Sequence, residues 1–182
     1  MSSSLREFQL RLSERIRQAA AAPMGTVRLG VRASTGNLLV DLSEVGEIVP
    51  FTGGVTPVPL TREWFRGLVN LRGSLYGVSD LGLFEGGAPL VPTRATRLLA
   101  FAPRLGLNAA LLVERTLGLQ AMPALREITP GEDGEGGQDT NDGAAPRVVW
   151  RGRRWLDDDG ERWDELSLEA LSANERFLAV NQ

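Results

Sequence analysis

The side chains available for chemistry in this sequence are almost entirely carboxylates, hydroxyls and guanidiniums. The 182 residues contain no Cys and no His, and all 20 basic residues are Arg. The chain therefore lacks a thiol nucleophile, an imidazole base and a lysine amine, which excludes thiolate and imidazole metal sites, Ser-His-Asp catalysis and Schiff-base chemistry. Carboxylate pairs remain, and they can hydrolyse glycosides or bind Ca²⁺. This inventory favours a protein that is not an enzyme, and no cofactor is expected.

Two acidic clusters are the candidates for carboxylate chemistry. The run at Asp139 does not fit a calcium loop, because Gly143 stands at loop position five instead of six and no Glu stands at position twelve. Residues 157–160 (DDDG) lie between two apolar stretches, where Asp-Gly predicts a hairpin turn. A two-residue turn there predicts the cross-strand pairs Leu156 with Trp163, Asp157 with Arg162, and Arg154 with Glu165. A solvated hairpin is thus preferred over a carboxylate enzyme for residues 157–165.

Arginines and tryptophans alternate near the C-terminal end of the chain, which offers a second class of function. Aromatic rings among guanidiniums are what a groove for single-stranded nucleic acid needs. The overall charge of −3 opposes a nucleic-acid backbone as the main partner. A small-barrel nucleic-acid binder is therefore kept as an alternative, carried by Trp150, Arg151, Arg153, Arg154, Trp155 and Trp163.

One arginine stands apart in residues 64–81 (WFRGLVNLRGSLYGVSDL). This stretch predicts an apolar strand, a sharp corner at Arg72 and Gly73, and a second apolar strand. A cation between two apolar strands does not fill a core, so Arg72 is a candidate recognition group. The alternative is that Arg72 caps carbonyls inside the protein and that Asn70 and Gly73 only shape the turn, which is the favoured interpretation of Asn70.

The rest of the chain predicts a mainly β protein. Period-two alternation and turn residues predict further strands at residues 26–32, 38–42, 45–50, 96–101, 107–113, 116–122, 147–156 and 161–166. Short helical turns are expected at residues 62–65, 80–85, 167–171 and 174–178. Residues 3–22 predict an amphipathic helix with Leu5, Phe8, Leu12 and Ile16 on one stripe. Packing of this helix on the domain is favoured over docking to a partner.

Composition sets the remaining expectations. Residues 129–146 are acidic and contain no large apolar side chain, so a flexible loop is predicted there. The N-terminus lacks the pattern of an export signal, and no apolar run approaches the ~18 residues that a membrane-spanning helix requires. A cytoplasmic protein is the expectation.

The motif around Arg72 resembles the signature of the CheW-like adaptor domains of bacterial chemosensory systems. The resemblance is carried by residues 67–73 (GLVNLRG) and 78–81 (VSDL), with support from residues 45–48 (VGEI) and 111–114 (LLVE). It covers roughly residues 25–172, and the wording around the motif is most similar to the members of the family that serve type IV pili. Gly77 departs from the family pattern, which usually has Pro there.

This resemblance implies two small five-stranded, SH3-like β-barrels, at about residues 25–90 and 94–166. Residues 1–24 are then an N-terminal helix and linker, and residues 173–182 a C-terminal tail. The resemblance further implies an adaptor that couples a chemoreceptor signalling domain to the regulatory domain of a CheA-type histidine kinase in the control of twitching motility. The receptor-binding residues that it implies are Val45, Glu47, Gly67, Asn70, Leu71, Arg72, Gly73 and Leu98.

Overall fold

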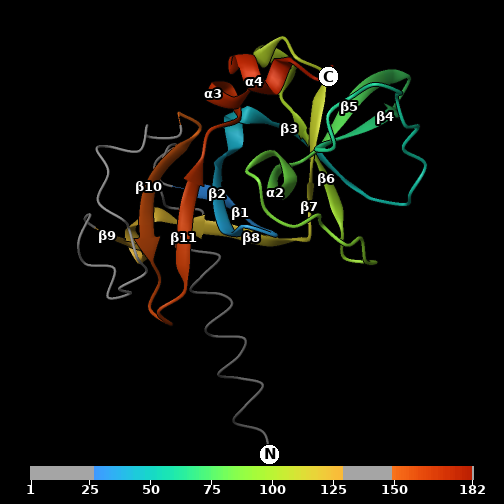
Figure 1. The fold of residues 1–182 in the computed structure, drawn as a ribbon. Helices are drawn as coiled ribbons and strands as arrows, with labels where there is room; N and C mark the ends of the chain where they lie inside the picture. Colours follow the sequence, from blue (N-terminus) through green and yellow to red (C-terminus); the bar gives the residue numbers. More distant parts are fainter. Residues whose placement is uncertain (1–26, 129–148, 182) are drawn as a thin grey trace, which may run out of the picture.

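The computed structural model describes residues 27–128 and 149–181, which form two β-sheets with a few short helices. Figure 1 shows the two sheets side by side, with the helical turns α3 and α4 above them. The six-stranded sheet has the order β8-β1-β2-β11-β10-β9, and the five-stranded sheet has the order β3-β6-β7-β5-β4. The first sheet contains β1 (Val27–Ala33), β2 (Gly36–Asp41), β8 (Arg115–Ala121), β9 (Arg126–Ile128), β10 (Arg151–Leu156) and β11 (Arg162–Leu166). The second contains β3 (Val45–Pro50), β4 (Phe65–Leu71), β5 (Ser74–Asp80), β6 (Arg97–Phe101) and β7 (Ala109–Val113).

The mainly β prediction is confirmed, but the prediction of two five-stranded barrels is wrong. Within the described ranges neither sheet closes on itself. The two edge strands of the six-stranded sheet, β8 and β9, follow each other in sequence through the 3-10 turn η3 (Met122–Ala124) and Leu125, but they do not pair. The strands also do not divide between the sheets near residue 90, since β6 and β7 join β3–β5 while β1 and β2 join β8–β11. The cause is two parallel pairs, β5 with β7 and β2 with β11. Parallel neighbours require long crossovers, which local alternation does not reveal.

The main apolar core lies between the two sheets. Val31 and Leu38 from one sheet and Leu99 and Leu111 from the other belong to one buried cluster, and all four are 0% exposed. Successive strand residues point to opposite faces, so the neighbours of Leu99 and Leu111 on β6 and β7 point away from this core. They form a second cluster on the far face of the five-stranded sheet, whose buried members are Val78, Leu90, Leu98, Ala100, Ala110 and Leu112.

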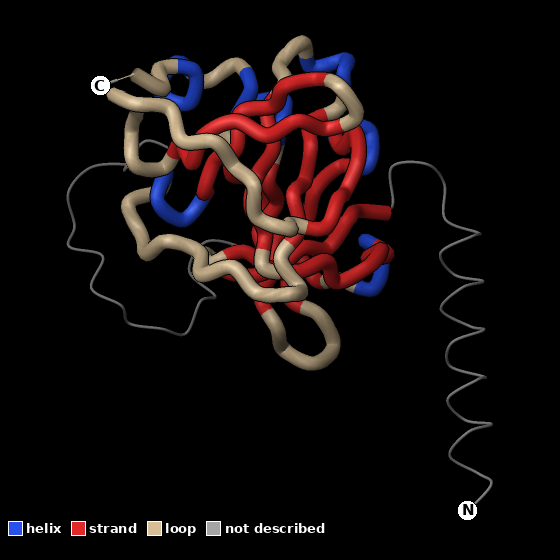
Figure 2. The backbone as a smooth tube through the Cα atoms, turned by 90° about the vertical axis from the view of Figure 1, so that its right-hand side faces the viewer, coloured by secondary structure: helices blue, strands red, loops and turns tan. Residues whose placement is uncertain are grey.

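The predicted helical turns at residues 80–85, 167–171 and 174–178 are present. They are α2 (Leu81–Phe84), α3 (Leu168–Ser172) and α4 (Glu175–Leu178). Figure 2 shows the short helical segments around the edges of the strand region. Each has a side-chain N-cap, supplied by Asp80, Ser167 and Asn174. Other short segments are the 3-10 turns η1 (Leu42–Glu44) and η2 (Pro103–Leu105). The expected helical turn at residues 62–65 is a single hydrogen-bonded turn instead.

The C-terminal residues are packed into the main core. Phe177 on α4 is 3% exposed and stacks on Trp64, with ring centroids 5.5 Å apart and planes at 13°. The backbone N–H of Arg62 donates to the carbonyl of Val180 at 2.8 Å. Residues 173–181, predicted as a tail beyond the domain, thus form part of its packed structure.

The β10–β11 hairpin is present, but its register differs from the prediction by one residue. Trp155 lies opposite Trp163, and Leu156 lies opposite Arg162. The loop is longer than expected: the N–H of Asp157 donates to the carbonyl of Glu161 at 3.1 Å, and Gly160 has a φ of +79°. A turn that ends with a left-handed glycine makes a three-residue loop and shifts every pair.

Several sequence predictions lie outside the described residues. They are the N-terminal segment 1–24 with its amphipathic helix at residues 3–22, and the acidic loop at residues 129–146. Among the described helices, none is long and apolar enough to cross a membrane.

Candidate functional site

The Arg72-Gly73 corner is a two-residue hairpin turn between β4 and β5. Leu71 pairs with Ser74, and both turn residues have positive φ, +51° for Arg72 and +90° for Gly73. Two positive φ values in a two-residue loop match a type I′ turn, which suits the twist of the flanking strands. The Asn70 side-chain oxygen accepts a hydrogen bond from the Gly73 N–H at 2.8 Å. Asn70 therefore shapes the turn, in agreement with the favoured interpretation of this residue.

The Arg72 side chain points out of the hairpin towards the other edge of the same sheet. It is 84% exposed, and its Nε lies 2.9 Å from Oε2 of Glu47, which is 26% exposed. Glu47 is on β3 and Arg72 follows β4, the two edge strands of the five-stranded sheet. The sheet is thus curled enough to bring its edges within side-chain reach. An exposed ion pair of this kind contributes little to stability, about 0–1 kcal/mol. Stabilising the fold is therefore not the main role of Arg72.

Beneath this ion pair lies the second apolar cluster. Glu47 pairs with Ala100, and Val49 pairs with Leu98, so Glu47 and Val49 face the cluster. Val69, Leu71 and Tyr76 from the β4–β5 hairpin are half-buried and pack against it from the other side. We call Glu47, Val49, Val69, Leu71 and Arg72 the Arg72 rim. A charged pair above half-buried aliphatic side chains is suited to bind an amphipathic helix, with apolar anchors and one arginine that fixes the register.

Three of the predicted receptor-binding residues lie away from this surface. Leu98 is 2% exposed, so it supports the rim from below. Val45 packs against the core between the sheets, because the β3 bulge between Val45 and Glu47 sends these two side chains to opposite faces. Gly67 is buried, and a Cβ added there would stand 2.2 Å from the Thr56 carbonyl oxygen, so this glycine permits close backbone approach.

Gly77 has a structural explanation for its departure from the family pattern. Its N–H donates to the carbonyl of Asn108 at 2.9 Å, a bond that Pro cannot make. A Cβ at this position would also stand 2.8 Å from the Phe65 ring. Gly77 therefore allows the β5–β7 junction and the Phe65 ring to approach closely.

The arginine and tryptophan pattern does not form an open stacking groove. Trp150 and Trp163 are 7% and 5% exposed, and their indole N–H groups donate to Glu85 at 3.0 Å and Asp157 at 2.9 Å. Arg151 donates through Nε to Glu85 Oε1 at 2.8 Å. The third tryptophan of the pattern, Trp155, is half-buried. The Arg153 guanidinium covers the face of its ring, 5.1 Å from the ring centroid. These residues join α2 to β10 and β10 to β11.

The carboxylates at residues 157–165 are likewise part of the hairpin. Asp157 accepts backbone N–H groups from Asp159 at 3.0 Å and Glu161 at 2.8 Å. Partial burial raises the pKa of Asp157, whereas the hydrogen bond from Trp163 and these backbone donors lower it. The lowering effects are larger in sum, so the pKa lies below its ordinary value of 3.8. Across the described ranges, no group of three or more metal-ligating side chains is close enough to hold an ion.

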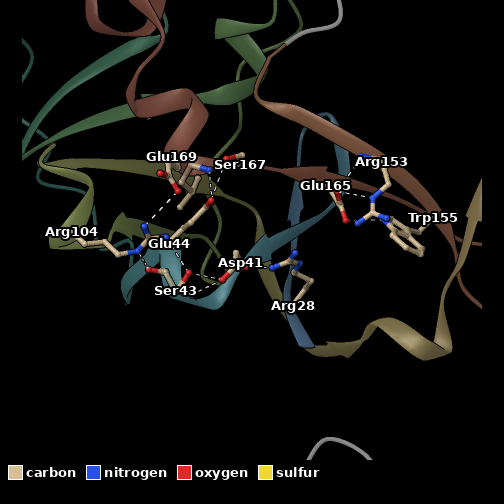
Figure 3. A network of polar contacts seen from close by, with 11 residues as sticks. Arg28, Asp41, Ser43, Glu44, Arg104, Arg153, Trp155, Glu165, Ser167 and Glu169 are labelled. Atoms are coloured by element: carbon tan, nitrogen blue, oxygen red, sulfur yellow. Dashed lines mark hydrogen bonds and ion pairs between the residues drawn. The ribbon is translucent and has the colours of Figure 1, made fainter. Parts of the chain in front are cut away.

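One polar network at the junction of the sheets carries no signal in the sequence. Figure 3 shows Glu44 reaching from η1 to α3, with Arg104 beside it. Glu44 is 8% exposed and accepts the N–H of Leu168 at 2.6 Å and the hydroxyl of Ser167 at 3.2 Å. The Arg104 Nε donates to the Ser43 carbonyl at 2.7 Å. This network fixes α3 against the start of β3, which is the strand that carries Glu47.

Comparison with known proteins agrees with this geometry. The model of the CheW-like domain family matches residues 27–145. Protein PilI of Pseudomonas aeruginosa is 30% identical over 95 residues, which span 52% of this chain and 52% of PilI, so the match covers about half of that relative. The scaffolding protein TtCheW of Thermoanaerobacter tengcongensis shares the fold with a TM-score of 0.59 at 18% identity, over 79% of this chain and 89% of its own. Because the family model matches well over half of the sequence, the chain belongs to the CheW-like domain family.

Proposed function

We propose that this chain is a non-enzymatic cytoplasmic adaptor that binds the signalling domain of a chemoreceptor and the regulatory domain of a CheA-type histidine kinase. The similarity to PilI supports a role in a system that controls type IV pili and twitching motility. The observation that carries the proposal is the Arg72 rim, where an 84% exposed arginine stands on a rigid turn above half-buried aliphatic side chains.

The rim is suited to a receptor helix for a physical reason. An amphipathic helix buries apolar side chains at a spacing of three or four residues, and Val49, Val69 and Leu71 offer complementary apolar area. Arg72 is held by a type I′ turn, so its backbone requires little ordering when a carboxylate or carbonyl of the helix binds. The adaptor role itself requires no proton transfer and no bond breaking, in keeping with the residue inventory of the sequence.

A binding experiment with the purified chain and a chemoreceptor signalling domain tests the proposal. We expect Arg72→Asp to weaken binding by about tenfold or more, because a central charged anchor is lost and a like charge is placed beside Glu47. Asp tolerates the positive φ of the first turn position, so the hairpin is preserved. Arg115→Asp, on the exposed β8 edge, makes the same charge change away from the rim and serves as the matched control.

The outcomes separate the role of the arginine from that of the protein. If Arg72→Asp and wild type bind equally well, Arg72 is not a receptor contact. If wild type binds neither a receptor signalling domain nor a kinase regulatory domain, the adaptor proposal is wrong.

A further inference from the structure

A surface hollow lies at the start of β4, formed by three segments that are distant in the sequence. It has a volume of about 470 Å³ and is lined by Arg62, Glu63, Trp64, Leu83, Arg176 and Ala179. These residues come from the segment before β4, from α2, and from α4 with the residue that follows it. A volume of this size is sufficient for several side chains of a bound peptide.

Two guanidiniums at this hollow are oriented by backbone carbonyls instead of carboxylates. Arg62 donates through Nε to the carbonyl of Asn181 at 3.2 Å. Arg176 donates through Nη2 to the carbonyl of Phe84, and its guanidinium lies 4.6 Å from the centroid of the Phe84 ring. A carbonyl fixes the direction of an arginine but does not neutralise its charge. Among the described residues neither arginine forms an ion pair, and Glu63 forms none with them.

One side of the hollow is formed by Trp64, which is packed among other aromatic rings. Trp64 is 7% exposed, stacks on Phe177, and meets the Phe84 ring edge-on at 5.1 Å. Two exposed leucines lie close in sequence to the residues that line the hollow. Leu60 is 81% exposed and Leu178 is 48% exposed. Since these aromatic groups are already ordered, a ligand that binds here has little protein entropy to offset.

The hollow and the Arg72 rim lie at opposite ends of one strand. Arg62 and Trp64 precede β4, and Arg72 follows it. At about 3.3 Å per residue, the seven residues of β4 separate the two surfaces by roughly 23 Å. One partner at the rim therefore leaves the hollow accessible to another.

We propose that this hollow is a second docking surface, which binds an acidic segment of a partner protein. A carboxylate of that segment bridges Arg62 and Arg176, whose remaining N–H donors offer charge-assisted hydrogen bonds. An adjacent apolar side chain of the segment packs against Trp64 and Leu83. The proposal adds a site to the adaptor and does not depend on what binds at the Arg72 rim.

Nuclear magnetic resonance titration of the full ¹⁵N-labelled chain tests this site directly. The probe is the acetylated, amidated peptide Asp-Glu-Leu-Glu-Asp, and its uncharged counterpart Asn-Gln-Leu-Gln-Asn is the ligand control. We expect the acidic peptide to shift the Trp64 indole signal and the amides of Leu83 and Ala179, with an affinity that falls as salt rises. The uncharged peptide should leave these signals in place.

Two single variants locate the charge. Arg62→Gln and Arg176→Gln should each weaken peptide binding by about tenfold, since each removes a charge-assisted contact. Arg115→Gln, an exposed arginine on β8, removes the same charge elsewhere and should leave the affinity unchanged. If Arg176→Gln unfolds because the Phe84 carbonyl loses its donor, the peptide affinity of Arg62→Gln alone tests the proposal.

Three results of the peptide titrations would overturn the proposal. They are peptide-induced shifts that are absent from the hollow, equal affinity of Arg62→Gln and wild type, and equal binding of the acidic and uncharged peptides. A concentration-dependent shift of the same signals without peptide, abolished by Arg62→Gln, would assign the hollow to a second copy of this chain and overturn it as well. Loss of receptor binding in Arg72→Asp has no bearing on any of these outcomes, so the two proposals fail separately.

Discussion

Gly67 permits a close backbone approach that a single methyl group should disrupt. Its φ is +126°, and an added Cβ would stand 2.2 Å from the Thr56 carbonyl oxygen. Thr56 and Leu68 exchange two backbone hydrogen bonds, of 2.8 and 2.9 Å, which attach the loop before β4 to that strand. Gly67→Ala therefore forces either the backbone of β4 or this loop to move.

The matched control for Gly67 is Gly36, the first residue of β2, directly after the β1–β2 turn. Gly36 has nearly the same φ, +123°, but no heavy atom lies within 4 Å of its added Cβ. Gly36→Ala should thus lower the free energy of unfolding only by the backbone strain, about 1–3 kcal/mol, less a small gain from the stiffer unfolded chain. Gly67→Ala should add the loss of two hydrogen bonds at about 1 kcal/mol each, so the two variants should differ by about 2 kcal/mol.

Urea unfolding followed by tryptophan fluorescence and circular dichroism measures both variants. A difference of less than about 0.5 kcal/mol between Gly67→Ala and Gly36→Ala would refute the steric argument. Any loss of receptor binding by Gly67→Ala should then scale with its loss of folded protein. Reduced binding by fully folded Gly67→Ala would instead indicate that the rim depends on the position of the Thr56 loop.

Three further predictions concern groups that fix the fold around the two surfaces. The pKa of Asp157 is lowered in the folded chain, so the ionised side chain should stabilise the fold fully above about pH 3.8 and lose this effect as the pH falls below that value. Asp157→Asn should therefore differ most from wild type at neutral pH, and the difference should shrink in acid. Urea unfolding at several pH values measures it. Glu44→Ala should lower the free energy of unfolding by about 1–3 kcal/mol, since it leaves the buried N–H of Leu168 without its acceptor, and an unchanged midpoint would contradict this. Phe177→Ala should cost about 3–5 kcal/mol through the cavity beside Trp64, which a loss of near-ultraviolet tryptophan ellipticity would report.

The candidate site shows where sequence reasoning succeeded. The Arg72-Gly73 corner was predictable, because glycine beside a short polar run between apolar strands favours a tight hairpin. The role of Asn70 in shaping that turn is also a local property, since its side chain bonds a backbone group three residues away. The hairpin at residues 157–160 was predicted for the same reason, and its register was wrong because Asp-Gly occurs in both two-residue and three-residue loops.

Other members of the predicted site could not be assigned correctly without coordinates. Alternation identifies two faces of a strand but does not say which face is covered. Leu98, implied as a receptor-binding residue, is 2% exposed and lies beneath the Arg72 rim. A bulge between Val45 and Glu47 separates two residues that the sequence places together. The hollow of Arg62 and Arg176 had no signal at all, because it depends on how the C-terminal residues pack beside the start of β4.

The sequence by itself determined the chemistry that this protein lacks, the positions of most strands and the turn that presents Arg72. These are consequences of side-chain type and of the period of two, which act over a few residues. Only the tertiary structure decided that β3 and β4 are the edges of one curled sheet, so that Glu47 meets Arg72. The physical reason is that two parallel strand pairs join remote segments, and such pairing is selected by burial of whole apolar faces against each other, a property of the complete fold.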